Sequence, residues 1–236
     1  LGTASTLELL GNDFTFSTLG SGFNCAAGDN WSFVGFGKYL LATNRTDGFQ
    51  QYDLDLGGST SSVADAPAAR ITFSAFNAVF GGDCDGNNRL LLNSAPFDHT
   101  NWTTRGAGYQ EFQEGEEILG GCECGTGIAL LFQRNAIRRL IYDQALFYRP
   151  EIMVKEQGAV NPDCIVPVKG GAYFIDTDGF YFVTPGMTEP QPIGAGRVDE
   201  EFLSRLAGNG LNSVQGAYDP ARHRVVWRYQ RNDVSS

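Results

Sequence analysis

The feature that most constrains the fold of this sequence is a pattern that recurs five times along the chain. Each copy is an apolar run, a polar turn and a second apolar run, which is typical of two antiparallel strands joined as a hairpin. The copies begin near residues 39, 78, 128, 172 and 215, so they lie 39–50 residues apart. A propeller blade repeats about every 40–50 residues. The sequence therefore predicts an all-β fold, a β-propeller of about five blades built from short antiparallel hairpins.

The predicted hairpins differ in turn chemistry and in which residues they bury. In the first, Tyr52, Leu54 and Leu56 alternate with acidic residues, which predicts a strand with one buried face. In the last, Asp219-Pro220 is typical of a type I turn. The hairpins are expected at residues 39–56, 78–94, 128–142, 170–186 and 215–229.

Each hairpin needs two further strands to make a complete blade. Apolar stretches of suitable length precede the second, third and fourth hairpins, and one more follows the fourth. They are "ARITFSAF" (69–76), "EILGGCE" (117–123), "CIVPVKG" (164–170) and "PQPIGAG" (190–196). We expect the first three to be inner strands and the last an outer strand.

One short helix is predicted near residues 197–207. Val198, Phe202 and Leu206 follow the i, i+4, i+8 spacing of a buried helical stripe. Glu200 and Glu201 lie in its first turn, where negative charge stabilises a helix. We expect both side chains to be exposed to solvent. We expect this helix to cap or link the fourth and fifth hairpins.

The first 30 residues are rich in Gly, Ser and Thr with a short apolar alternation. We interpret residues 1–30 as a closing strand or linker, or as the remnant of an upstream domain, and residues 31–236 as the propeller domain. The chain starts at Leu1 without an initiator Met, which suggests a piece of a longer protein. No run approaches the about 20 apolar residues of a membrane span, so no membrane partner is expected.

The charge balance argues against sequence-specific nucleic-acid binding. The net charge is −10, and Arg138-Arg139 is the only adjacent basic pair. Proteins that bind DNA specifically usually carry a basic patch. An acidic protein can still handle DNA if it lets DNA slide past without sticking, because like charges repel.

Cys122-Glu-Cys124 would place two thiols on one face of a strand. A zinc site would need two further ligands, and His99 and His223 are the only histidines. The sequence favours reduced, structural cysteines over a metal site. The five cysteines are Cys25, Cys84, Cys122, Cys124 and Cys164.

Two groups of acidic residues lie in predicted turns. Asp176 and Asp178 lack the ligand series of an EF-hand loop, and Asp178-Gly179 between apolar runs favours a type I′ hairpin instead. Asp83, Asp85 and Asn87 have better spacing for a hard cation but no bidentate Glu follows, so a polar turn is favoured.

The fourth hairpin is dense in aromatic residues. Because alternate side chains of a strand point to opposite faces, we expect Phe180 and Phe182 to face one neighbouring blade and Tyr181 to face the other.

Other features raise the possibility of an enzyme or a sugar-binding protein. Glu114, Glu116 and Glu117 could supply a glycosidic acid/base pair, although a solvated acidic turn is the simpler interpretation. His99 and His223 read as surface histidines, and neither a G-x-S-x-G elbow nor a phosphate-binding loop is present.

The three tryptophans allow two interpretations. Trp31, Trp102 and Trp227 are either stacking platforms for a sugar or packing residues of the blades.

The order of several motifs resembles the propeller-like tail proteins of bacteriophages, in particular the nozzle or hub component of short-tailed phages. The resemblance covers roughly residues 33–230. Its most specific part is "LFQRNAIRRLIY" followed by "DTDGFYFV" and "IGAGRVDEEFL". The other motifs are "ADAPAARITFSAFNAVFGG" (64–82), "NRLLLNSAPFDHTNW" (88–102) and "AYDPARHRVVWRY" (217–229).

This resemblance implies a structural role in the virion and no enzymatic activity. It implies a ring-forming homo-oligomer, commonly a hexamer, below the portal and adaptor, with tail fibre or spike proteins as further partners. Double-stranded DNA would pass through its channel without sequence-specific binding. The family offers no catalytic, cofactor-binding or metal-binding residues to transfer, and no cofactor is expected. The alternatives are a carbohydrate-binding or glycan-cleaving β-propeller and, third, a protein-binding scaffold of the kelch or WD type.

Overall fold

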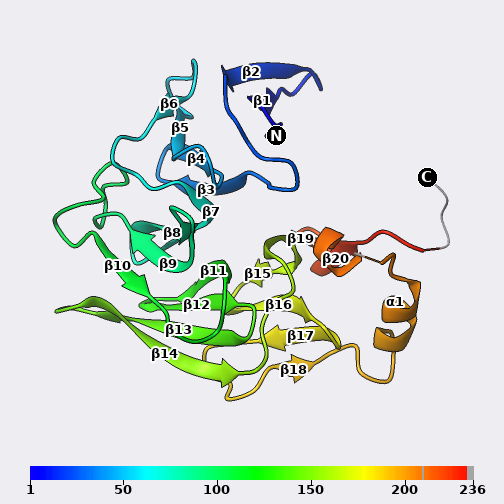
Figure 1. Cartoon of the computed structure of the whole chain (residues 1–236). Helices are drawn as coiled ribbons and strands as arrows, with labels where there is room; N and C mark the ends of the chain where they lie inside the picture. The colour runs from blue at the N-terminus through cyan, green and yellow to red at the C-terminus, as the bar shows by residue number, and fades with distance from the viewer. Residues whose placement is uncertain (209, 233–236) are drawn as a thin grey trace. The chain divides into compact units, whose positions relative to one another are not determined.

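The computed structural model describes residues 1–208 and 210–232, which form two compact units (Figure 1). The first unit is Leu1–Gln113 and the second is Glu114–Ser236. The described sheets in both units are antiparallel, and their strands follow one another in sequence order. Among the described residues, no helix has the length and apolar character needed to cross a bilayer.

The first unit contains a two-stranded sheet and two four-stranded sheets. The two-stranded sheet is β1 (Thr6–Leu10) with β2 (Phe16–Ser21). The next comprises β3 (Ser32–Phe36), β4 (Tyr39–Thr43), β5 (Gln50–Asp53) and β6 (Ser61–Ser62). The third comprises β7 (Ala69–Ala75), β8 (Ala78–Cys84), β9 (Asn87–Asn93) and β10 (Gly108–Glu111).

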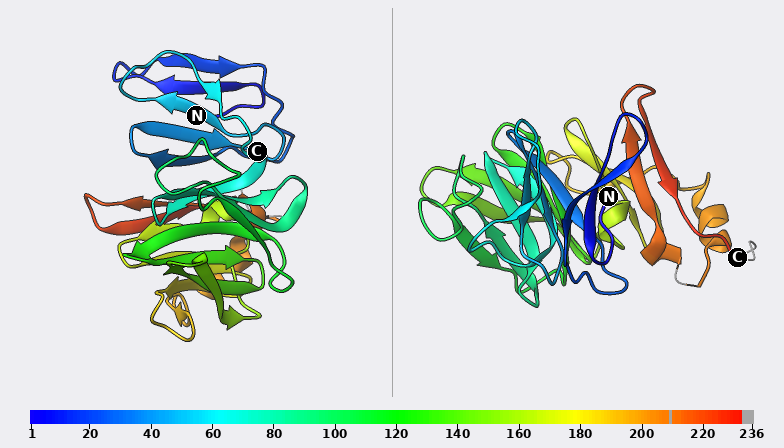
Figure 2. Two further views of the ribbon diagram at one scale, coloured as in Figure 1. Left: turned by 90° about the vertical axis from the view of Figure 1, so that its left-hand side faces the viewer. Right: turned by 90° about the horizontal axis from the view of Figure 1, so that it is seen from above.

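Apolar side chains hold these sheets together. Leu41, Phe49 and Val79 belong to a buried cluster between the two four-stranded sheets. Leu7 and Trp31 belong to a smaller buried cluster. The β1–β2 hairpin lies against the β3–β6 sheet (Figure 2). Residues 1–30 therefore form part of the first unit, while their assignment as a linker or domain remnant stays a prediction.

The second unit repeats this composition of sheets. One four-stranded sheet comprises β11 (Ile118–Gly125), β12 (Ile128–Gln133), β13 (Ala136–Asp143) and β14 (Phe147–Lys155). The other comprises β15 (Val166–Val168), β16 (Gly171–Asp176), β17 (Gly179–Val183) and β18 (Gln191–Pro192). The two-stranded sheet is β19 (Gln215–Asp219) with β20 (Arg224–Arg228), and the helices are η1 (Pro162–Cys164), α1 (Asp199–Arg205) and η2 (Gly210–Ser213).

The aromatic residues of β16 and β17 face both neighbours, as predicted. The ring of Phe180 lies 5.0 Å from that of Trp227 on β20. On the opposite face, Tyr181 stacks on Phe174 at 5.6 Å, and Phe174 in turn lies 5.4 Å from Phe132 on β12. These contacts, on the two faces of the β15–β18 sheet, join the three sheets of the second unit.

All five predicted hairpins are present. They are β4–β5, β8–β9, β12–β13, β16–β17 and β19–β20. The four additional predicted strands are also confirmed, as β7, β11, β15 and β18. The predicted blades are thus four-stranded sheets, except that β19–β20 has two strands in the described part of the chain.

Two burial predictions are wrong. Leu54 and Leu56 are exposed because β5 ends at Asp53, whose carboxylate accepts hydrogen bonds from the backbone N–H of Asp55 and Leu56 and turns the chain. Val198 is also exposed.

The helix itself is confirmed as α1, which connects β18 to β19 (Figure 1). It begins at Asp199, one residue after Val198, so its buried face consists mainly of Phe202. Glu200 and Glu201 are solvent-exposed, as predicted.

Candidate functional site

The acidic turn between β8 and β9 is a polar turn in which a buried carboxylate pairs with a partly exposed arginine. The Asp83 carboxylate accepts hydrogen bonds from Nε and Nη2 of Arg45 at 3.2 and 2.6 Å, and Arg70 Nη1 lies 3.8 Å away. Asp85 accepts from the backbone N–H of Ala68 at 3.1 Å, and Asn87 donates to Glu111. The carboxylates of Asp83 and Asp85 therefore accept hydrogen bonds from other groups of the protein, as expected for a polar turn.

The Asp176–Asp178 segment is a hairpin corner, as predicted, but its geometry is not type I′. Asp176 pairs with Gly179, which leaves Thr177 and Asp178 as the two turn residues. Neither has the positive φ that a type I′ turn requires. Asp178 accepts a hydrogen bond from the hydroxyl of Tyr181 at 2.8 Å.

Asp176 is buried, and burial raises the pKa of its carboxyl. It accepts hydrogen bonds from the backbone N–H of Thr177 at 2.7 Å and of Gly158 at 3.4 Å. Its position fits a structural link between the turn and the preceding loop.

The three glutamates of the segment before β11 point to separate partners. Glu117 forms a hydrogen-bonded ion pair with Arg134 and is partly buried, which corrects the prediction of a fully solvated turn. Glu116 accepts from the Asn135 amide at 2.6 Å, and Glu114 lies 3.4 Å from Lys155 Nζ. This arrangement does not resemble the facing pair of carboxylates that glycosidic chemistry uses.

The two histidines have different environments. His99 is buried, which corrects the prediction of a surface histidine: its Nε2 lies 2.6 Å from Oε1 of Gln51, and its ring lies against Phe36 and Tyr39. Burial lowers its pKa. His223 is exposed at the end of the β19–β20 hairpin, as predicted.

The tryptophans act as packing residues. Each indole Nε1–H donates to a backbone carbonyl: Trp31 to Thr3 at 2.8 Å, Trp102 to His99 at 2.9 Å, and Trp227 to Cys164 at 3.1 Å. Trp31 and Trp102 are buried and Trp227 is half-buried, so their faces contact the protein. This supports blade packing over sugar stacking.

The five cysteines are free thiols. As predicted, Cys122 and Cys124 lie on one face of β11, with their Sγ atoms 3.7 Å apart. The hydrogen bond between them lowers the pKa of Cys124 and raises that of buried Cys122. No group of three or more His, Cys, Asp or Glu side chains is gathered for a metal ion within residues 1–208 and 210–232.

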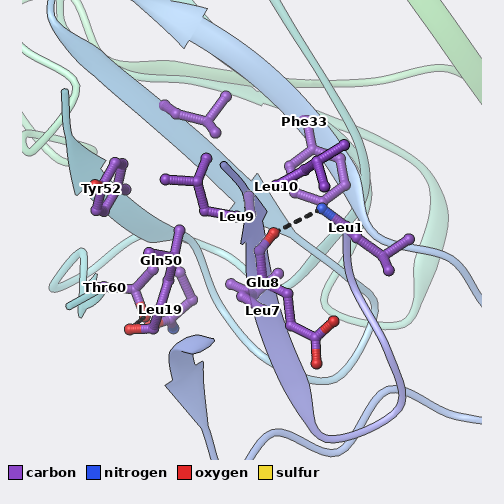
Figure 3. Close-up of a pocket in the computed structure, with 12 residues that line it drawn as sticks. Leu1, Leu7, Glu8, Leu9, Leu10, Leu19, Phe33, Gln50, Tyr52 and Thr60 are labelled. Carbon is purple, nitrogen blue, oxygen red and sulfur yellow. Dashed lines mark hydrogen bonds between the residues drawn. The ribbon is translucent and has the colours of Figure 1, made fainter. Parts of the chain in front are cut away.

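A cavity of about 320 Å³ lies between the β1–β2 hairpin and the β3–β6 sheet of the first unit (Figure 3). Its walls are mainly apolar and include Leu7, Leu9, Leu19, Phe33, Leu40 and Ala42. Glu8, Gln50, Tyr52 and Thr60 contribute polar groups. The cavity suits an apolar group better than it suits catalysis. The apolar alternation of the first segment is visible in the sequence, but nothing in it predicts the cavity.

Comparisons with known proteins identify the fold. No protein-family model and no curated protein sequence matches the chain. Among solved structures, a quinonprotein alcohol dehydrogenase-like protein from Bacteroides thetaiotaomicron matches 93% of this chain and 53% of its own, with a TM-score of 0.55 and 10% identity. The WD40 domain of Neurospora crassa Pan2 matches 78% of this chain and 58% of its own, with a TM-score of 0.51 and 7% identity. The chain has a β-propeller fold.

A third propeller-like match is YCF48 bound to D1 peptide, with a TM-score of 0.52 and 12% identity. It covers 84% of this chain and 61% of the other. The chain thus spans less than two thirds of the length of each of these three structures. At such low identity the likeness supports the propeller fold alone.

Proposed function

We propose that this β-propeller is a structural, non-enzymatic subunit of a bacteriophage tail. In this proposal it forms a ring, commonly a hexamer, as the nozzle or hub below the portal and adaptor. The ring lines the DNA ejection channel and is located in the virion. The propeller fold and the order of the motifs described above support this assignment.

The observation that carries the proposal is an exposed apolar surface on the first unit. Leu10, Phe14 and Phe16 of the β1–β2 hairpin are 50%, 84% and 55% exposed, and Phe33 at the nearby cavity is 42% exposed. Large apolar groups gathered on one surface are typical of a protein–protein interface. We infer that another subunit covers them.

Phe14 is also strained. It has a φ of 61°, in the left-handed region that costs a bulky residue about 1–2 kcal/mol. Phe97 of the same unit is as strained and nearly as exposed, so we base the inference on the grouping of Phe14 with the paired Leu10 and Phe16 in one hairpin and not on strain.

The charge of the chain supports the proposed DNA channel. A net charge of −10 disfavours tight contact with phosphates and would let double-stranded DNA pass without sequence-specific binding. The adaptor or portal-side proteins and the tail fibres or spikes are the further partners proposed here.

Light scattering and negative-stain imaging of the purified protein at rising concentration test the proposal. We expect rings with a central channel, and we expect Phe14→Asp to weaken their assembly. Phe97→Asp is a matched control, because Phe97 is also exposed in the first unit and has a φ of 64°. A monomer at every concentration would count against the ring, and equal effects of both variants would exclude the β1–β2 surface.

A separate observation tests the virion assignment. A portal or terminase gene beside the coding sequence would support it, and a complete genome without either gene would overturn it.

A further inference from the structure

Cys122 and Cys124 form a pair of thiols at the edge of a sheet. They lie on β11, whose one neighbouring strand among the described residues is β12, and their Sγ atoms are 3.7 Å apart. This separation exceeds the about 2.05 Å of a disulfide bond, so the two sulfurs are free but in contact. One ion placed between them could bind both.

One thiol of the pair is shielded from solvent and the other is partly accessible to it. Cys122 is buried in a cluster with Leu119, Leu130 and Phe132, whereas Cys124 is only partly buried at the edge of the same cluster. Apolar walls on one side keep water away from a bound ion, and the exposed part of Cys124 gives the ion a path from solvent.

The strand that carries the pair is irregular. The pairing of β11 with β12 is irregular between Ile118 and Gly120 and again between Glu123 and Gly125, so Cys122 lies between the two irregularities and Cys124 lies within the second. Strand irregularities of this kind commonly direct side chains at functional sites.

The number of available sulfurs limits the kind of ion. Zinc in proteins takes four ligands in a tetrahedron. In the described chain no third His, Cys, Asp or Glu joins the pair. Cys164, the other thiol of this cluster, donates to the carbonyls of Asn161 and Ile175 at 3.1 and 3.5 Å.

We propose that Cys122 and Cys124 form a two-sulfur binding site for a soft, thiophilic monovalent cation. Monovalent copper is the physiological ion of this class, since thiolates select it over harder metals. Binding replaces the two thiol protons with two copper–sulfur bonds, and the protons pass to the buffer; no electron is transferred. The site is independent of the proposed tail function.

Anaerobic titration of the reduced full chain with monovalent copper, in competition with the chromophoric chelator bicinchoninate, tests the site. We expect one copper ion per chain. Cys122→Ser and Cys124→Ser should each weaken binding by at least about 100-fold, because loss of second-shell groups alone costs 10–100-fold. Cys25→Ser is the matched control, since Cys25 is a buried thiol of the first unit, and should bind as wild type does.

A second measurement uses the wild-type protein, so its result does not depend on whether the variants fold. Copper should protect Cys124 from alkylation by iodoacetamide, as read by peptide mass spectrometry. The proposal fails if copper gives no protection, or if the Cys122→Ser/Cys124→Ser double variant binds as tightly as wild type. It also fails if the reduced protein binds cobalt(II) in the tetrahedral geometry of a zinc site.

Discussion

The carboxylate of Asp83 on β8 accepts two hydrogen bonds from Arg45, from Nε at 3.2 Å and from Nη2 at 2.6 Å. Arg45 lies in the loop between β4 and β5, so this pair joins the two four-stranded sheets of the first unit. Asp83 is only 4% exposed, whereas the side chain of Arg45 is 45% exposed. A buried carboxylate is thus held by a guanidinium that remains in contact with water.

We predict that Asp83→Asn lowers the free energy of unfolding by about 1–3 kcal/mol. Breaking a fully buried pair costs about 3–5 kcal/mol, and the exposure of Arg45 reduces that figure. Asp83 has a φ of 56°, which asparagine also tolerates, so the substitution changes charge without adding backbone strain. Urea unfolding measures the effect.

Asp85→Asn is the control for this prediction. Asp85 has a φ of 51°, and its carboxylate accepts a hydrogen bond from the backbone N–H of Ala68 instead of pairing with an arginine. We expect a change within about 0.5 kcal/mol. Equal effects of the two substitutions on the free energy of unfolding would show that the Asp83–Arg45 pair stabilises the fold no more than the Asp85 hydrogen bond does.

The hairpins were predictable because their signals are local. The alternation of apolar residues and turn residues such as Asp219-Pro220 are recognised within a few positions, and so are the acidic residues in the first turn of α1. Leu54 and Leu56 show the limit of such local signals, since the two hydrogen bonds that the Asp53 carboxylate accepts end the strand and expose both residues.

The partners of polar side chains could not be predicted, because they lie far apart in sequence. Asp83 meets Arg45 across 38 residues, and His99 meets Gln51 across 48. Only the folded chain brings these groups together, so a buried His99 resembles a surface histidine in the sequence. That Cys122 and Cys124 share one face was predictable because a strand places alternate residues on one face, whereas the 3.7 Å contact of their sulfurs was not predicted.

We predict that Trp227→Phe costs about 1–2 kcal/mol of stability. Phenylalanine preserves the ring contact with Phe180 but removes the donor to the carbonyl of Cys164, a buried residue. Val226→Thr, on the exposed face of the same strand, keeps a β-branched side chain and should change stability by less than about 0.5 kcal/mol. Urea unfolding compares the two; a neutral Trp227→Phe would mean that the indole hydrogen bond contributes nothing.

We predict that stability decreases as the pH falls below about 6.5, the usual pKa of histidine. Burial lowers the pKa of His99 in the folded state, although neighbouring Asp98 opposes this shift. The unfolded chain therefore takes up a proton first, and the stability present above pH 6.5 is lost as the pH falls toward the folded pKa.

His99→Gln should flatten this dependence when free energies of unfolding are compared between pH 7.5 and pH 5. Exposed His223 offers the control, because His223→Gln should retain the slope of the wild type. If both substitutions leave the slope unchanged, other groups set the acid sensitivity.

We predict that Gly194→Ala destabilises the second unit by about 1–3 kcal/mol. A methyl group at Gly194 would overlap the carboxylate of Asp199, which accepts a hydrogen bond from the backbone N–H of Phe180 at 3.2 Å. The same carboxylate lies against Gly179, so it has little space to move away. Alanine would therefore disturb both the hairpin and the first turn of α1.

A double-mutant cycle separates this overlap from a general effect of alanine. Asp199→Ala removes the carboxylate, so adding Gly194→Ala to it should cost much less than Gly194→Ala does in the wild type. At Gly186 the nearest atom to an added methyl group is 4.0 Å away, so Gly186→Ala should be neutral or slightly stabilising. Additive effects of Gly194→Ala and Asp199→Ala in thermal unfolding would contradict the overlap, because they would mean that the two residues do not interact.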